Sequence, residues 1–100
     1  MNSNSMLTLV IVKAELKHDT EMFGKMDPFV KLTSEHLKLQ TKVHENGGKK
    51  PVWDQPFNID PDYLGDEVKF WVLDQDLASQ DIIGHCTIKK RRAYSRRRHY

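Results

Sequence analysis

The stretch from Val68 to Asp81 constrains the fold of this 100-residue chain more than any other. It begins as an apolar run in which Val68, Phe70 and Val72 alternate with other residues, as on one face of a β-strand. Three carboxylates follow within eight residues, with no Lys or Arg among them: Asp74, Asp76 and Asp81. Carboxylates this close repel one another unless a positive charge lies between them. A hard cation such as calcium, which takes about six to eight oxygen ligands, is one solution, and a solvated acidic turn is the other.

The rest of the chain is a series of short strand-like segments separated by turn signals. Besides residues 67–74, the segments with alternating or β-branched composition are 6–14, 29–32, 37–43, 53–59 and 82–88. Asn46-Gly47-Gly48 is a strong turn signal, residues 61–66 are predicted as a loop or short helical turn, and Pro56 predicts an edge strand or a bulge. Six short strands and no convincing amphipathic helix predict an all-β antiparallel sandwich.

Composition limits the remaining possibilities. The chain fits one domain with an ordinary apolar fraction of 38%, and no apolar run approaches the ~20 residues that span a bilayer. The first five residues carry no basic charge before Leu7, so we expect no signal peptide and a cytoplasmic location. The lone Cys86 cannot form an internal disulfide, and its strand-like neighbours predict a buried thiol.

The formal net charge of +2 hides an asymmetry between the body and the end of the chain. Residues 1–88 hold nine lysines against fourteen acids, a net charge of −5, whereas residues 89–100 hold seven basic residues and no acid. We therefore expect a disordered segment at 1–5, a folded domain at 6–90 and a basic tail at 91–100. Such a tail could bind an anionic membrane or, as a weaker alternative, nucleic acid.

Four segments in register resemble the C2 domain, a Greek-key β-sandwich that docks on phospholipid membranes, often through calcium. They are the opening strand ending LVIVKAELK, then GKMDPFVKL at 24–32, then QTKV with KKPVWDQPFNI at 49–59, and VLDQDLASQDIIG at 72–84. The resemblance covers roughly residues 7–88 in the family's order and spacing. A complete C2 sandwich has eight strands, so six leave it incomplete. A truncated or alternative C-terminus, a strand from another chain and an unrecognised tail strand all remain open.

The resemblance implies two calcium-binding loops at one end of the sandwich. The calcium ligands carried over by position are Glu21, Asp27, Asp74, Asp76 and Asp81, with Asp19 as an alternative to Glu21. Glu21 replaces the Asp that the family usually has there, and the spacing from Asp76 to Asp81 is one residue shorter than in the commonest form. Apolar residues at the loop tips that could enter the membrane interface are Met22, Phe23 and Leu77.

A second surface is basic. Lys31, Lys38 and Lys42 resemble the family's lysine-rich patch for anionic lipid headgroups, although a solvated sheet face would look the same. No catalytic arrangement is visible, so we expect no enzyme. The sequence thus predicts a calcium-dependent module that docks reversibly on anionic phospholipid membranes. The alternative is a calcium-independent C2 adaptor that binds a protein partner or anionic lipid through its lysine face and basic tail.

Overall fold

The computed structural model describes residues 6–17, 25–75 and 80–89, without the side chains of residues 80 and 81. The described strands are β1 (Leu7–Lys13), β2 (Pro28–Ser34), β3 (Leu37–Gln40), β4 (Val52–Ile59), β5 (Glu67–Gln75) and β6 (Gln80–Lys89). A single turn of 3-10 helix, η1 (Pro61–Tyr63), lies within the predicted loop or helical turn. The predicted all-β sandwich is confirmed, and so are its six strands within a few residues at each end. None of the described helical residues forms a helix long and apolar enough to cross a membrane.

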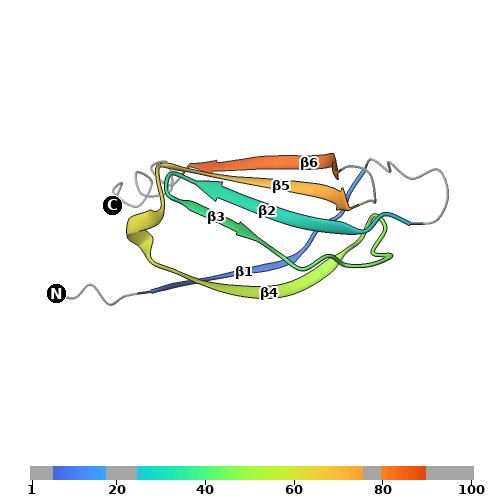
Figure 1. Cartoon of the computed structure of the whole chain (residues 1–100), viewed down its shortest axis with the longest axis horizontal. Helices are drawn as coiled ribbons and strands as arrows, with labels where there is room; N and C mark the ends of the chain where they lie inside the picture. The colour runs from blue at the N-terminus through green and yellow to red at the C-terminus, as the bar shows by residue number, and fades with distance from the viewer. Residues whose placement is uncertain (1–5, 18–24, 76–79, 90–100) are drawn as a thin grey trace, which may run out of the picture.

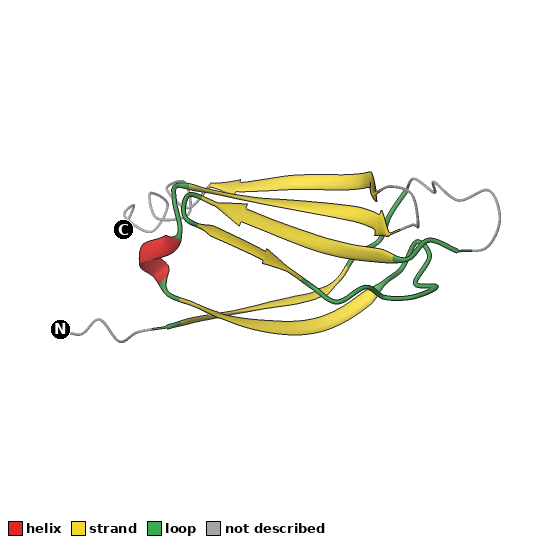
Figure 2. Ribbon diagram, viewed as in Figure 1, coloured by secondary structure: helices red, strands yellow, loops and turns green. Residues whose placement is uncertain are grey.

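The strands form two antiparallel layers, as Figures 1 and 2 show. One sheet has four strands in the order β3-β2-β5-β6, and the other has two, β1 and β4. Pro56 lies in β4 opposite Val10, and the structure describes no strand on the other side of β4. The prediction that Pro56 marks an edge strand is therefore correct, because a proline cannot donate to a ladder on that side.

The core lies between the layers and is built by alternation along the strands. Val30 and Leu32 of β2 are at most 4% exposed, and they stand in register with Val72 and Phe70 of β5. In the smaller sheet Leu7 is in register with Ile59, which is 2% exposed. One face of each sheet therefore carries the apolar side chains that meet between the layers.

The predicted strand at 37–43 ends early, at Gln40, because Thr41 replaces the regular ladder with a side-chain bond. The Thr41 backbone N–H donates to the Val30 carbonyl at 2.9 Å, and the Thr41 hydroxyl accepts from the Val30 N–H at 2.9 Å. The same hydroxyl donates to the Lys42 carbonyl. A buried hydroxyl thus does the work of a backbone carbonyl at this position.

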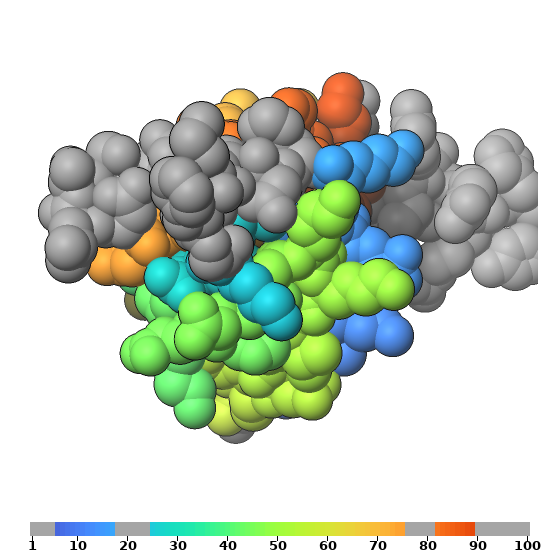
Figure 3. Space-filling view, turned by 90° about the vertical axis from the view of Figure 1, so that its right-hand side faces the viewer, coloured from blue at the N-terminus to red at the C-terminus, as the bar shows by residue number. Residues whose placement is uncertain are grey.

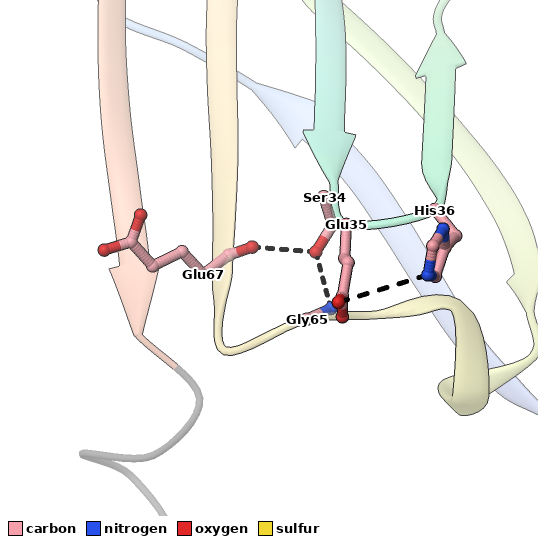
Figure 4. A network of polar contacts seen from close by, with 5 residues as sticks. All are labelled: Ser34, Glu35, His36, Gly65 and Glu67. Atoms are coloured by element: carbon pink, nitrogen blue, oxygen red, sulfur yellow. Dashed lines mark hydrogen bonds and ion pairs between the residues drawn. The ribbon is translucent and has the colours of Figure 1, made fainter.

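The end of the molecule near η1 is held by a small polar network (Figure 4). The Ser34 hydroxyl donates to the Glu67 carbonyl at 2.7 Å and accepts from the Gly65 N–H at 2.8 Å. These two bonds join the end of β2 to the start of β5. In the turn between β2 and β3, the exposed His36 side chain has its Nε2 atom 4.0 Å from Oε2 of Glu35.

The core-facing residues of β6 are partly open to solvent, which makes the prediction for Cys86 wrong. Its thiol was predicted to be buried, whereas Cys86 is exposed. By register Cys86 faces the core side of the sheet, opposite Phe70. β6 is an edge strand that, among the described residues, pairs only with β5, so Cys86 lies at the margin of the core.

Candidate functional site

Two of the predicted ligands, Asp27 and Asp74, meet at the end of the sandwich away from η1. Asp74 is the penultimate residue of β5, in register with Pro28, and its side chain is completely buried. An Asp74 carboxylate oxygen accepts a hydrogen bond from the Asp27 N–H at 2.8 Å, while the Gln75 N–H donates to the Asp27 carbonyl at 3.0 Å. These bonds fix the start of β2 against the end of β5, so the two carboxylates belong to one rigid pole.

The turn after β3 closes around Asp27. The Asn46 N–H donates to an Asp27 carboxylate oxygen at 2.7 Å, and the Gly48 N–H donates to the Met26 carbonyl at 3.0 Å. Asn46 and Gly48 both have left-handed backbone conformations, with φ of 59° and 65°. Gly and Asn tolerate these values best, which is the physical content of the Asn-Gly-Gly signal.

This turn also shapes the surface beside Asp27. An open depression is lined by Asp27, Val43, Glu45, Asn46 and Gln75. Figure 3 views the molecule from this end, where cyan residues near the start of β2 lie beside green residues of the turn. We call this end, defined by Asp27, Asp74 and the start of β6, the acidic pole.

Of the remaining predicted ligands and loop-tip residues, the structure describes only the backbone of Asp81. Asp81 lies in β6 in register with Asp74, so its backbone reaches the acidic pole. Six other predicted residues lie outside the described part of the chain: Asp19, Glu21, Met22, Phe23, Asp76 and Leu77. Their role in binding stays a prediction.

The residues that are described fit a calcium site in chemistry and place. Carboxylate oxygens are the ligands that calcium prefers, and the carboxylates of Asp27 and Asp74 stand at one pole. The described residues alone do not form a group of three or more His, Cys, Asp or Glu side chains able to hold a metal. A site with about six to eight oxygens at this pole would therefore need the carboxylates of the two adjoining segments.

The lysine face is formed by the outer side of the four-stranded sheet. Lys31 is in register with Gln40 and Thr33 with Lys38, so Lys31 and Lys38 point to the same side. On the next strand Lys69 stands opposite Thr33, and it joins them on that side. Lys42 lies beyond the end of β3, with its N–H bonded to the Gln55 side chain at 2.8 Å. We use the term lysine face for Lys31, Lys38 and Lys69.

Four residues of these surfaces were not among the predicted site residues: Asn46, Glu45, Lys69 and Trp71. The sequence predicts Asn46 as a turn residue and gives no signal that its N–H binds Asp27 or that Glu45 lies beside it. Lys69 could have been found, since it alternates with the apolar residues of its strand. Trp71 stands beside Lys31 on the lysine face, with its ring centroid 5.8 Å from that of His85. This arrangement depends on the register of three strands, for which the sequence holds no local signal.

Comparison with known proteins identifies the fold family. The family model described as the C2 domain matches residues 5–100. The chain is 30% identical over 83 residues to the 16 kDa phloem protein 2 of Arabidopsis thaliana, a match that covers 82% of this chain and 56% of that protein. It is 31% identical over 84 residues to synaptotagmin-5 of the same plant, which covers 82% of this chain and 15% of that protein. The chain thus spans about half of the first relative and a small part of the second.

A solved structure agrees with these relatives. The C2 domain-containing protein from a putative elicitor-responsive gene superimposes with a TM-score of 0.64 at 26% identity. The match covers 92% of this chain and 68% of that one. The similarity therefore extends over almost the whole of this chain.

Proposed function

The chain belongs to the C2 domain family, and from this membership and its acidic pole we propose that it is a non-catalytic module that docks on anionic phospholipid membranes with calcium. The observation that carries the proposal is the 2.8 Å hydrogen bond from the Asp27 backbone N–H to the Asp74 carboxylate, which holds both residues at one pole. Charged side chains are rarely buried without a purpose, and Asp74 is completely buried at the rim of the sheet. A fixed pair of carboxylates at the end of a sandwich is a preformed part of a cation site.

The chain's own residues would act mainly by holding position. The Asp27 N–H and the Asn46 N–H each engage one carboxylate oxygen, so the two side chains lose little conformational entropy when a cation arrives. When bound, calcium would reverse the negative sign of the pole and offer open coordination positions to headgroup phosphates or carboxylates. Without it, a body with a net charge of −5 would repel the same headgroups.

We assign the other predicted ligands, Glu21 or Asp19, Asp76 and Asp81, to the same pole. Met22, Phe23 and Leu77 are the proposed membrane-contacting residues of the adjoining loops. The docking domain is residues 6–90, and the tail at 91–100 adds a second, purely electrostatic contact with the membrane. We expect the protein to be cytoplasmic and to associate with membranes reversibly.

Calcium-independent binding is the second candidate, favoured by the lysine face. Lys31 and Lys38 with Lys69 give three positive charges on one side of a rigid sheet, and each contributes about 1 kcal/mol near an anionic leaflet. This surface, with Lys42 nearby and the basic tail, would serve an adaptor that joins a protein partner to anionic lipid. Its binding would weaken steeply with salt and ignore chelators.

Co-sedimentation of the full chain with phosphatidylserine vesicles tests the first candidate. We expect binding in calcium that is lost in chelator. Asp27→Asn retains an oxygen that can accept from Asn46 but loses the charge, so it should weaken calcium-dependent binding at least tenfold. Asp62→Asn in η1 removes an exposed charge at the opposite end and should leave binding unchanged.

Two outcomes would overturn the calcium mechanism. Equal binding in calcium and chelator, reduced by Lys31→Ala with Lys38→Ala, would assign the function to the lysine face. Calcium-dependent binding that Asp27→Asn does not alter would move the metal away from the acidic pole. Thermal unfolding with and without calcium, in the absence of lipid, separates loss of metal binding from loss of lipid contact.

A further inference from the structure

Part of the core face of the sandwich is open to solvent. In β6, Ile88 stands in register with Val68 on the core side, yet it is 54% exposed, and Cys86 beside it is exposed too. In β1, Leu7 shares the core side with buried Ile59 and is 43% exposed. In both layers, therefore, apolar residues on the core-facing side of a strand are about half exposed to solvent. A monomer seldom leaves such apolar surface uncovered without a partner.

The same two strands carry unpaired edges. Within the described residues β1 pairs only with β4, and β6 pairs only with β5. The two strands run in opposite directions, as Figure 1 shows. They also belong to different layers. The other two edge strands of the described residues, β3 and β4, differ from them in that none of their core-facing residues is exposed. Open edges with apolar side chains are templates for pairing with another chain.

We propose that a second copy of this chain covers both open strands in a two-fold symmetric dimer. In this dimer β6 of each copy pairs antiparallel with β1 of the other. A two-fold axis parallel to the strands, lying between the layers, exchanges the layers and keeps every strand direction. Both layers then become continuous six-stranded sheets, ordered β3-β2-β5-β6 and then β1-β4 of the second copy. Because one operation closes both edges, no edge of β1 or β6 is left to extend the assembly further.

The side chains favour one register for this pairing. Core-facing residues must stand opposite core-facing residues, because a slip of one position would turn every side chain to the wrong face. In β1 these residues are Leu7, Leu9 and Ile11; in β6 they are Ile88, Cys86 and Gly84. Placing Leu7 opposite Ile88 also places Leu9 opposite Cys86 and Ile11 opposite Gly84. Large residues then face small ones along most of the seam, as in a packed sheet interior.

The overhanging parts of the two large sheets would also cover each other. The larger sheet has two strands more than the smaller one, so in the dimer β5 and β6 would lie over β6 and β5 of the second copy. Phe70 and Val72, which are half-buried in the single chain, would then be enclosed. A second copy thus covers both open edges and both open faces in one step.

The symmetry has a consequence for membrane docking, which rests on the function proposed above. An axis parallel to the strands leaves both acidic poles at the same end of the dimer. Two poles would therefore reach one membrane together, and the second contact would be intramolecular. Such bivalency raises apparent affinity well beyond that of one site.

Sedimentation equilibrium of the full chain over a concentration series, without lipid or calcium, tests the dimer itself. We expect twice the mass of the chain at high concentration, and loss of the dimer in Ile88→Lys, which places a charge opposite Leu7 of the second copy. Val52→Lys is the matched control, since Val52 is exposed to 46% but lies on β4, away from the seam. Circular dichroism verifies that each variant is folded.

A cysteine pair tests the register even if Ile88→Lys fails to fold. Residues directly opposite on antiparallel strands have Cβ atoms about 4.5–5.5 Å apart, so Leu9→Cys should form a disulfide with the native Cys86 of the second copy under mild oxidation. Val52→Cys should not form that disulfide. In the unmodified chain, the reaction of Cys86 with a thiol reagent should slow as protein concentration rises.

A chain that stays monomeric at all concentrations overturns the proposal and leaves residues 90–100 of the same chain as the occupant to examine. A dimer that Ile88→Lys and Leu9→Cys do not affect overturns this interface. A dimer with the expected disulfide but no calcium-dependent vesicle binding supports the interface and refutes the proposed function, so the two failures are distinguishable.

Discussion

Replacing Thr41 by Val tests whether one buried hydroxyl holds β2 against the segment after β3. Valine has nearly the same shape and the same β-branching, so packing and strand propensity change little. What changes is the partner of the Val30 N–H, which donates to the Thr41 hydroxyl at 2.9 Å. Thr41 and Val30 are each only 4% exposed, so water cannot readily replace the lost acceptor.

The magnitude follows from the asymmetry between a bond made and a group left unsatisfied. A typical hydrogen bond contributes about 1 kcal/mol, but a buried donor without an acceptor costs about 1–3 kcal/mol. We expect Thr41→Val to lower the free energy of unfolding by about 1–3 kcal/mol, the cost of an unsatisfied buried donor. For a domain of this size, the melting temperature would fall by roughly 4–8 °C for each kcal/mol.

Thr8 supplies the matched control. Its hydroxyl also donates a hydrogen bond, to the Asn58 side chain at 3.0 Å, but both residues are exposed. Thr8→Val should change stability by less than about 0.5 kcal/mol, because water satisfies the groups left behind. Urea unfolding of the two variants, with amide exchange of Val30, measures the effect. Equal losses in the two variants, or unchanged exchange at Val30, would refute the reasoning.

Three further predictions concern local structure, and urea unfolding measures each of them. Ser34→Ala removes the bonds to the Glu67 carbonyl and the Gly65 N–H and should cost about 1 kcal/mol; no loss would mean that water replaces both bonds at this half-buried site. Asp54 has a φ of 46° inside β4, so Asp54→Ala should cost about 1 kcal/mol while Asp54→Gly costs nothing; equal effects would contradict a conformational cause. Gly48→Ala, at a φ of 65°, should also destabilise by about 1 kcal/mol, and a neutral result would indicate that the turn relaxes.

The strands themselves could be predicted because each carries its pattern within a few residues. Alternation in 68–72 and β-branching in 6–14 identify strands without reference to any partner. Pro56 predicted an edge strand or a bulge for an equally local reason, the missing N–H, and its strand lies at an edge of the described sheet. Thr41 shows the limit of such reasoning, since the predicted strand continues through it in pattern. The strand ends at Gln40 because the Val30 N–H donates to the Thr41 hydroxyl instead of to a backbone carbonyl. Only the tertiary structure places Val30 where it can do so.

The acidic pole could likewise be predicted only in part from the sequence. The sequence indicated Asp27 and Asp74 as parts of one site through their segments' resemblance to a family. It did not indicate that Asp74 would be completely buried, or that the backbones of Asp27 and Asn46 would fix the two carboxylates. Those contacts join segments that are far apart along the chain, and no short-range pattern encodes them.

By itself, the sequence determined the fold class, the order and approximate bounds of six strands, the family and the residue types at the acidic pole. These depend on side-chain alternation, turn residues and spacing, all of which act over a few neighbouring positions. Only the tertiary structure decided that Cys86 is exposed, that Lys69 joins the lysine face, and that β1 and β6 are edge strands of different layers among the described residues. The exposure of a residue depends on which residues of the other sheet pack against it. The sequence of a single strand does not contain that information.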